Sequence, residues 1–253
     1  MDLGLEGKRA IVTGGSKGIG RRVVDLLAAE GCDVAFCARD KAGVDDTVTA
    51  NSNAPGKVTG AAVDVSDDAA LRAWIAEAGA AMGGIDIVVA NASSLVVGAD
   101  AAAWQKGLDV DVLGTVRTVE AAMPFLETSK SASIVGIAST AAVQTARGVR
   151  AYSGIKAAIV AYLSGLSNVA GTRGIRANCV SPGAIEFPGG NWERRKTADP
   201  ATYNAALARS PFGRLGTAEE VANAVVFLAS PAASYISGTN LVVDGAATTR
   251  IQY

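Results

Sequence analysis

Short and nearly uninterrupted runs of apolar residues alternate along this chain with longer segments whose apolar residues recur every three or four positions. Such runs are typical of strands buried on both faces of a parallel sheet, and the longer segments are typical of the helices that cover it. The expected strands lie in KRAIVTG, DVAFCA, KVTGAAVDV, IDIVVANAS, SASIVGIAST, GIRANCVSPG and TNLVVDG. Because strands and helices alternate without a linker, we predict one doubly wound α/β domain over residues 1–253, with a parallel sheet of about seven strands and helices on both faces.

Most of the expected helices have recognisable ends. Gly31 closes GIGRRVVDLLAAEG, Ser66 is expected to cap SDDAALRAWIAEAGAAMGG, and WQKGLDVDVLGTVRTVEAAMPFL is expected to end near Pro124. Two further helices are expected in RAYSGIKAAIVAYLSGLSNVAG and TAEEVANAVVFLAS. Residues 184–214 interrupt the alternation with a long, aromatic and irregular segment. Long loops in compact domains are usually functional, so we expect this segment to be the substrate loop.

Composition and charge exclude several classes of function. The chain has 23 basic and 24 acidic residues and a net charge of −1, which argues against partners such as nucleic acid or an anionic membrane surface. It has no run of 18 apolar residues and no signal-peptide pattern at its N-terminus, so we expect a cytoplasmic protein. The absence of histidine excludes His-based acid–base catalysis and His-ligated metals, and we expect no metal site. The three cysteines lie in or beside strand-like runs and are expected to be buried thiols.

A glycine-rich turn follows the first expected strand. In IVTGGSKGIGRR, Gly14, Gly18 and Gly20 lie between this strand and the first expected helix. Glycine permits a tight turn and a close approach of the backbone to a pyrophosphate, and the start of a helix offers free N–H groups. This context predicts a dinucleotide-binding, Rossmann-like domain.

One expected helix carries a tyrosine and a lysine four residues apart. Tyr152 and Lys156, in RAYSGIKAAIVAYL, therefore share a helix face. A phenol has an ordinary pKa of roughly 10 and is a reluctant proton donor or acceptor at neutral pH, whereas a fixed ammonium group nearby favours the phenolate. The pair predicts a site of proton transfer.

Together, T-G-x-x-x-G-x-G and Y-x-x-x-K resemble the motifs of the short-chain dehydrogenase/reductase family. The similarity extends over nearly the whole chain, through VDV, NAS, GIASTAA, SPG and YISGTNLVVDGA, and is strongest to members like 3-oxoacyl-acyl-carrier-protein reductase. The resemblance implies that Tyr152 exchanges a proton with the substrate, that Ser139 hydrogen-bonds the same oxygen, and that Lys156 binds the nicotinamide ribose and promotes ionisation of the phenol.

The resemblance also implies the residues that bind cofactor and substrate. The expected cofactor residues are Gly14, Ser16, Lys17, Gly18, Ile19, Gly20, Arg39, Asp64, Val65, Asn91, Tyr152, Lys156, Pro182, Gly183 and Ile185. The expected substrate residues are Ser139, Tyr152, Phe187 and Trp192. The composition of segment 184–214 further suggests an apolar pocket with Arg194, Arg195 and Lys196 as a basic rim, and Ser94 to Val97, Val143 and Gln144 are expected to form its opposite wall. The same three basic residues could instead form an ordinary solvated face.

Charges after the second strand favour NADP(H) over NAD(H) as the cofactor. Relatives that prefer NAD carry an acidic residue where this chain has Ala38, and that acid binds the ribose hydroxyls and repels a 2′-phosphate. Arg39 follows directly, and Lys17 lies in the glycine turn, so two cations are expected where the 2′-phosphate would lie. Asp40 is adjacent and weakens the expectation.

Two residues depart from the family pattern. Asp111 stands where relatives carry an asparagine that helps to hold a relay water near the lysine, and Phe187 stands where relatives carry a threonine near the carboxamide. We include Asp111 among the catalytic candidates. Either its backbone serves the same purpose as that of asparagine, or its carboxylate lies beside Lys156.

The predicted activity is therefore hydride transfer between NADP(H) and a carbonyl or secondary alcohol, in a small molecule or in a carrier-bound substrate such as a 3-oxoacyl thioester. Two alternatives are an NAD-dependent dehydrogenase of the alcohol or hydroxysteroid type and a non-catalytic NADP(H)-binding regulator. The family resemblance also implies a homotetramer that assembles partly through the helices at about 105–127 and 150–171.

Overall fold

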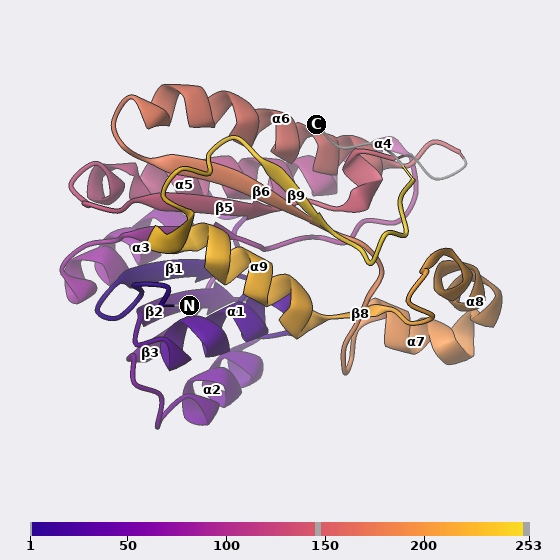
Figure 1. Ribbon diagram of the computed structural model, residues 1–253, viewed down its shortest axis with the longest axis horizontal. Coiled ribbons are helices and arrows are strands. Elements are labelled where there is room, and N and C mark those ends of the chain that lie inside the picture. The colour runs from indigo at the N-terminus through magenta and orange to yellow at the C-terminus, as the bar shows by residue number, and fades with distance from the viewer. Residues whose placement is uncertain (1, 145–147, 250–253) are drawn as a thin grey trace.

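Seven parallel strands form the central sheet of the computed structural model, which describes residues 2–144 and 148–249 (Figure 1). Their order is β3-β2-β1-β4-β5-β6-β9. The strands are β1 (Arg9–Thr13), β2 (Asp33–Ala38), β3 (Val58–Ala62), β4 (Ile87–Ala90), β5 (Ser133–Ile137), β6 (Arg176–Pro182) and β9 (Asn240–Val243). The predicted α/β class and parallel sheet are confirmed.

Helices cover both faces of this sheet. The helices α1 (Gly18–Ala29), α2 (Lys41–Ala50) and α9 (Ala218–Ala229) pack on one face, and α3 (Asp68–Met82), α5 (Gly114–Leu126) and α6 (Ala151–Gly171) pack on the other. The helix α4 (Ala101–Gly107) leads through a π-helix, Leu108–Leu113, directly into α5. Two single-turn 3₁₀ helices lie at Thr140–Ala142 and Pro231–Ala233.

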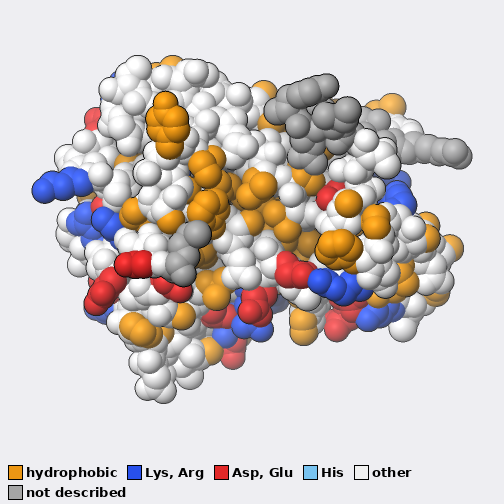
Figure 2. Space-filling model, in the orientation of Figure 1, with side chains coloured by type: hydrophobic (Ala, Val, Ile, Leu, Met, Phe, Trp, Pro, Cys, Tyr) orange, Lys and Arg blue, Asp and Glu red, His pale blue; other side chains and the backbone are white. Residues whose placement is uncertain are grey.

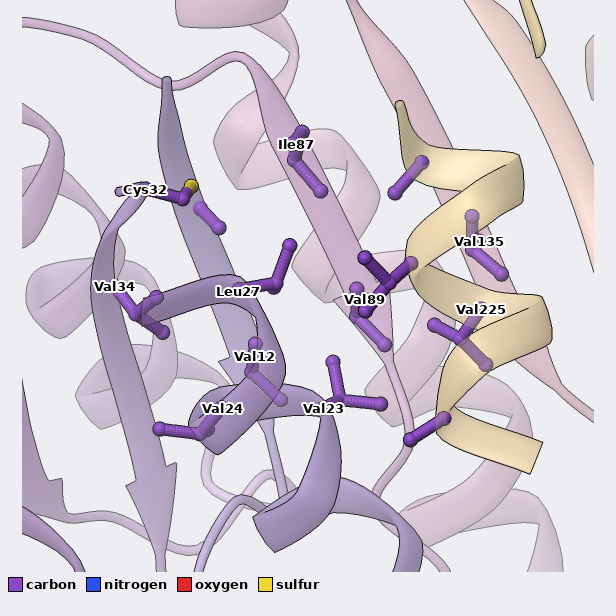
Figure 3. Packing of buried hydrophobic residues seen from close by; sticks show 14 of the residues in the cluster. Val12, Val23, Val24, Leu27, Cys32, Val34, Ile87, Val89, Val135 and Val225 are labelled. Carbon is purple, nitrogen blue, oxygen red and sulfur yellow. The ribbon is translucent and has the colours of Figure 1, made fainter. Parts of the chain in front are cut away.

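The apolar residues of each strand alternate between two cores. In β1, Val12 faces the core beneath α1 and α9, while Ile11 faces the core beneath α3, α5 and α6. Figure 3 shows the first core, where Val23 and Leu27 of α1 and Val225 of α9 lie side by side over the strands of the sheet. Because both faces are covered, the strands need apolar residues at successive positions, which explains their uninterrupted runs.

The order of the strands fixes where a ligand would bind. From β1 the chain builds outward through β2 and β3, and from β4 it builds outward in the opposite direction. Thr13, the last residue of β1, pairs with Cys37 of β2 and with Ala90 of β4. In open α/β sheets, ligands bind beyond the carboxyl ends of the strands at such a switch point.

One expected helix end was wrong. Asp67, and not Ser66, caps α3: its side chain accepts a hydrogen bond from the Ala70 N–H, while the Ser66 hydroxyl bonds Asp64 instead. The helix α5 ends at Leu126, near Pro124 as expected.

The segment 184–214 is far more regular than expected. It contains β7 (Ile185–Glu186), α7 (Asn191–Ala198) and α8 (Pro200–Arg209), and β7 pairs with β8 (Gly216–Thr217) in a separate small sheet. In Figure 1 the two helices stand beside the main body of the protein, at the end toward which β6 and β9 run. Their polar sequences hid them, because neither helix has a broad apolar face to bury.

A buried carboxylate joins the starts of β1 and β4. The two oxygens of Asp86 accept hydrogen bonds from the backbone N–H of Arg9 at 3.0 Å, from its guanidinium at 2.8 and 2.9 Å, and from the Ser129 hydroxyl at 2.6 Å. Burial alone would raise the pKa of Asp86, but Arg9 and Ser129 hold it below its ordinary value. The contact therefore stabilises the fold through the ionised form of the carboxylate.

We expect Asp86→Asn to lower the free energy of unfolding at neutral pH by about 1–2 kcal/mol, because an amide has one acceptor oxygen for the two guanidinium N–H groups of Arg9. The loss is modest because Arg9 is partly exposed. A carboxylate whose pKa is lowered by folding stabilises above its unfolded pKa of roughly 4 and loses that effect as pH falls. The difference from the parent protein should therefore shrink in acid. Urea unfolding at several pH values measures it, with Asp45→Asn at the exposed Lys41 pair as control. Equal losses in the two variants, or a difference independent of pH, would refute this role.

The surface carries no segregated charge on the face seen in Figure 2, where acidic and basic side chains lie next to one another over the described residues. None of the helices in ranges 2–144 and 148–249 combines the length and apolarity that a membrane span requires. Within the same ranges, no three residues of the metal-binding types His, Cys, Asp and Glu come together as a potential metal site. All three cysteines are free and buried.

Candidate active site

The predicted site residues gather beyond the carboxyl ends of β1, β4 and β5. The glycine turn follows β1, Asn91 follows β4, and Ser139 lies two residues beyond the end of β5. Tyr152 and Lys156 come from the first turns of α6, and Asp111 comes from the π-helix before α5. Lys156 connects these elements, because its ammonium group contacts Ile137 of β5, Asp111 and the ring of Tyr152.

The backbone conformation and close packing of the glycine turn leave no space for side chains at its glycine positions. Gly14 and Gly18 have left-handed φ values of +70° and +56°, and a Cβ on Gly20 would lie 2.2 Å from the Gly14 carbonyl oxygen. The side-chain amide of Asn91 fixes the turn by donating to the carbonyl oxygens of Thr13 and Gly14, both at 3.0 Å. The predicted residue Asn91 thus supports the turn directly.

The start of α1 presents backbone donors that no side chain caps. Its N-cap residue is Lys17, whose side chain makes no capping hydrogen bond. The first turn, Gly18, Ile19 and Gly20, therefore offers N–H groups and the positive end of the helix dipole to an anion. This arrangement fits the pyrophosphate of a dinucleotide.

The residues expected to read the 2′-phosphate lie around the start of α2. The Lys17 ammonium is 3.6 Å from Asp40, and both side chains are largely exposed. Ser16 faces Gly43, and the absence of a side chain on Gly43 keeps the space beside the Ser16 hydroxyl open. Arg39 is exposed and close enough to Asp64 to act on it electrostatically. Two acidic residues thus accompany the two cations.

Asp64 and Val65 lie beyond the end of β3. The Asp64 carboxylate accepts hydrogen bonds from the N–H and the hydroxyl of Ser66, at 2.9 and 2.7 Å. Burial would raise the pKa of Asp64, but these bonds and the charge of Arg39 hold it below its ordinary value. Val65 is buried against Gly114.

Ser139 and Tyr152 each keep a hydroxyl available for a ligand. The Ser139 oxygen accepts a hydrogen bond from the Ala141 N–H at 3.1 Å, which leaves its own proton free to donate. Across the described ranges, the Tyr152 hydroxyl has no hydrogen-bond partner. Both groups can therefore turn toward the oxygen of a bound carbonyl or alcohol.

Lys156 is almost completely buried, with 2% of its side chain exposed. Its ammonium group donates to the Ile137 carbonyl oxygen at 3.1 Å, lies 3.1 Å from Asp111 Oδ1, and is 5.7 Å from the centre of the Tyr152 ring. An ammonium group has three N–H donors, so one remains after these two contacts. That donor can bind a ribose hydroxyl beside Tyr152.

The structure places the Asp111 carboxylate, and not only its backbone, at this lysine. Burial alone would raise the pKa of Asp111, but the Lys156 charge and hydrogen bonds from Ser93 and Ser94 hold it below its ordinary value. Asp111 is therefore an anion at neutral pH. The two serines were not predicted as partners of Asp111, although a pair of hydroxyl residues directly after Asn91 and Ala92 was a visible signal.

The segment after β6 brings Phe187 onto the glycine turn. Pro182 ends this strand, and Gly183 follows it and donates to the Val243 carbonyl oxygen at 2.9 Å. Ile185 is buried in β7. The ring of Phe187 covers Gly18 so closely that a Cβ there would lie 2.6 Å from the ring. The expected substrate residue thus contacts the proposed phosphate site.

The basic rim is occupied by neighbours within its own segment. Arg194 donates to the Gly189 carbonyl oxygen at 2.9 Å, and Arg195 lies 5.2 Å above the ring of Trp192. Lys196 pairs with Glu186 and lies over the ring of Tyr203. The pair with Glu186 offsets the charge of Lys196, whereas the contacts of Arg194 and Arg195 leave their guanidinium charges in place.

Residues 14–248 match the family described as Enoyl-(Acyl carrier protein) reductase. Isoepoxydon dehydrogenase patN of Penicillium expansum is 36% identical over 97% of this chain and 96% of that protein. The 3-oxoacyl-(acyl-carrier-protein) reductase FabG of Escherichia coli (strain K12) is 33% identical over 96% of this chain and 98% of that protein.

Solved structures show the same similarity. A short chain dehydrogenase from Burkholderia cenocepacia J2315, in complex with NADP, is 31% identical, has a TM-score of 0.87, and covers 96% of this chain and 98% of its own. L-Sorbose reductase from Gluconobacter frateurii, complexed with NADPH and L-sorbose, is 28% identical, has a TM-score of 0.90, and covers 99% of this chain and 100% of its own.

Proposed function

The chain belongs to the short-chain dehydrogenase/reductase family, and we propose that it transfers hydride between NADP(H) and a small carbonyl compound or secondary alcohol. The relatives named above are oxidoreductases of carbonyl and alcohol substrates. The observation that carries this proposal is the convergence of Tyr152 and Lys156 at the carboxyl end of β5, directly before Ser139, on the sheet edge where the glycine turn follows β1. A non-catalytic regulator would not need a buried ammonium group beside a phenol whose hydroxyl has no hydrogen-bond partner in the described part of the chain.

Each of the three residues has a distinct task in this reaction. When bound, the nicotinamide supplies or accepts the hydride. The Ser139 hydroxyl donates a hydrogen bond to the substrate oxygen and orients it. Tyr152 gives its proton to that oxygen during reduction and takes it back during oxidation, and the nearby Lys156 ammonium stabilises the phenolate that forms.

The preference for NADP(H) rests on the residues after β2. Ala38 stands where an acid would repel a 2′-phosphate, and Arg39, Lys17 and the Ser16 hydroxyl are the groups that would bind it. Structures similar to this chain contain NADP or NADPH. Asp40 and Asp64 oppose the two cations, so NAD(H) is the alternative cofactor that the experiment must include.

Two substrate classes follow from two different observations. The relatives named 3-oxoacyl-(acyl-carrier-protein) reductase favour a carrier-bound thioester. The pairing of Lys196 with Glu186 offsets one of the three cations of the basic rim, which favours a small uncharged carbonyl over an acidic carrier protein. We place the small carbonyl first.

Consumption of NADPH by the purified protein tests both the reaction and the substrate class. The panel consists of cyclic ketones, ketoses, a 3-oxoacyl thioester of a small thiol and the same acyl group on carrier protein, each with NADPH and with NADH. Turnover of a small ketone with NADPH is expected. Turnover confined to the carrier-bound thioester would replace the first substrate class with the second, and binding of NADPH without turnover of any compound would point to the regulator.

Phe187 is expected to hinder cofactor binding. Its ring covers Gly18, one of the residues whose N–H group would face the pyrophosphate, so the ring must move before the phosphates reach the turn. We expect Phe187→Ala to lower the Kd for NADPH by roughly two- to fivefold, because a smaller fraction of the protein then needs to rearrange. A titration of NADPH fluorescence measures this, with Phe212→Ala on the exposed Phe212 ring as control. A raised Kd would show that the ring supports the bound cofactor instead.

The proposed homotetramer has one supporting observation. Leu108 and Leu113 of the π-helix and Val169 of α6 are exposed apolar residues on the two helical segments through which assembly is expected. Exposed apolar side chains on adjacent helices are typical of a surface that a partner covers.

A further inference from the structure

The Asp111 carboxylate receives hydrogen bonds on both of its oxygens. Oδ1 lies 3.1 Å from the Lys156 ammonium and accepts from the Ser93 hydroxyl at 2.5 Å. Oδ2 accepts from the Ser94 N–H at 2.7 Å and from the Ser94 hydroxyl at 2.6 Å. With 1% of Asp111 exposed, water cannot replace any of these partners.

Two of these partners can only donate. The Lys156 ammonium has no acceptor, and neither has the backbone N–H of Ser94, and they approach opposite oxygens of the carboxylate. An asparagine amide has one acceptor oxygen, so its NH₂ group would face one of the two donors. The position is therefore built for a carboxylate, and asparagine does not replace Asp111 without loss.

Ser93 and Ser94 begin a segment that returns to the catalytic helix. The segment runs from the end of β4 to Gly98, whose carbonyl oxygen accepts a hydrogen bond at 3.0 Å from the N–H of Ala151. Ala151 is the first residue of α6 and directly precedes Tyr152. Asp111 thus holds Lys156 directly, and it holds the segment whose other end is bonded beside Tyr152.

The same segment presents apolar side chains to solvent. Leu95 and Val97 are 54% and 84% exposed, and they line a surface hollow of about 340 Å³ together with Ser94 and Val96. Leu95 has a left-handed φ of +48°, which a leucine rarely adopts unless its neighbours enforce it. The neighbouring bonds from Ser94 to Asp111 are placed to enforce it.

We propose that Asp111 is a positioning residue that uses its two oxygens to hold the catalytic lysine and the segment Ser93–Gly98 in one arrangement, and that this segment is the wall against which the apolar part of the substrate packs. The inference rests on the proposed function for its account of the substrate. Its structural half, the hold of Asp111 on the segment, does not depend on any activity.

Asp111→Asn distinguishes the contact of Asp111 with Lys156 from its contact with the segment Ser93–Gly98. The single amide oxygen should remain with Lys156, because a charged donor forms the stronger bond, and the Ser94 N–H then loses its acceptor. Hydrogen exchange in the peptide 93–97 is expected to accelerate about tenfold, and the KM for the carbonyl substrate to rise about tenfold, as the loss of one charge-assisted bond allows. The Kd for NADPH should change by less than about threefold, because Lys156 keeps its partner.

Asp109→Asn is the matched control, since Asp109 lies in the same π-helix and, within residues 2–144 and 148–249, its carboxylate binds only the exposed side chain of Gln105. The proposal is overturned if the two variants show the same exchange and KM, or if the KM and the NADPH Kd of Asp111→Asn rise by the same factor, which would indicate general damage to the site.

A second variant keeps the test valid if Asp111→Asn does not fold. The double change Ser93→Ala and Ser94→Ala removes both hydroxyl donors and keeps the Ser94 N–H and the Lys156 pair. Faster exchange in residues 93–97 and a raised KM with an unchanged NADPH Kd are expected, and parental values for both would overturn the proposal. Failure of the proposed function gives a different result. The parent protein would then reduce no carbonyl, while hydrogen exchange in residues 93–97 would still accelerate in these variants.

Discussion

Tyr152→Phe is expected to lower kcat/KM for carbonyl reduction by a factor of about 10²–10⁴ and to leave NADPH binding unchanged. The substitution removes one hydroxyl, which makes no hydrogen bond within the described part of the protein, so the fold loses no contact. The ring itself stays beside the Lys156 ammonium. The whole loss should therefore appear in turnover, because the reduced substrate no longer receives a proton from a positioned donor.

Steady-state kinetics and an NADPH titration measure the two halves of this expectation. Tyr162→Phe is the matched control, because Tyr162 lies in the same helix, half-buried among apolar neighbours, where burial raises the pKa of its phenol to about 12. Loss of its hydroxyl should leave kcat/KM near the parental value. Near-parental activity in Tyr152→Phe would remove the tyrosine from the reaction.

Arg39→Ala should raise the KM for NADPH about ten- to a hundredfold and leave the KM for NADH nearly unchanged, because a charge-assisted phosphate contact contributes roughly 1.5–3 kcal/mol. Arg39 is exposed and acts on Asp64 only through its charge, so its removal should not disturb the fold. Only NADPH carries the 2′-phosphate, and the two cofactors therefore report on the same variant with and without the contact.

Arg22→Ala provides the control for loss of a surface cation near the same turn, since Arg22 is an exposed residue of α1 that pairs with Asp25. This variant should bind NADPH and NADH as the parent protein does. If Arg39→Ala weakens both cofactors equally, Arg39 does not read the 2′-phosphate, and Lys17 and Ser16 remain the candidates for that contact.

The fold was largely predictable because its strands are buried on both faces. Continuous apolar runs, such as the one ending at Thr13, need no information beyond their own sequence. The small helices α7 and α8 were not predictable in this way, because almost none of their residues are buried and no apolar stripe marks them. The helix α2 was missed for the same reason, with Val44 and Thr47 as its only buried residues.

The site was predictable where its parts share one local motif. Tyr152 and Lys156 lie four residues apart in one helix, and the glycine turn is a single segment. The partners of Asp111 come from the segment after β4, 17 and 18 residues away, and from α6, 45 residues away, and only the folded chain brings them together. The position of Phe187 over Gly18 likewise depends on the path of the chain after β6, which no local pattern defines.

Transfer of deuterium from labelled NADPH to product tests the central claim most directly. The parent protein is incubated with a ketone of the panel that it reduces and, in turn, with each of the two NADPH stereoisomers deuterated at nicotinamide C4. The alcohol that forms is analysed by mass spectrometry and NMR. The account predicts that one isomer delivers its deuterium to the carbon that bears the new hydroxyl in the parent protein, and that Tyr152→Phe forms the same labelled alcohol about 10²–10⁴ times more slowly. An alcohol without deuterium from either isomer, or no alcohol from any member of the panel, would contradict it.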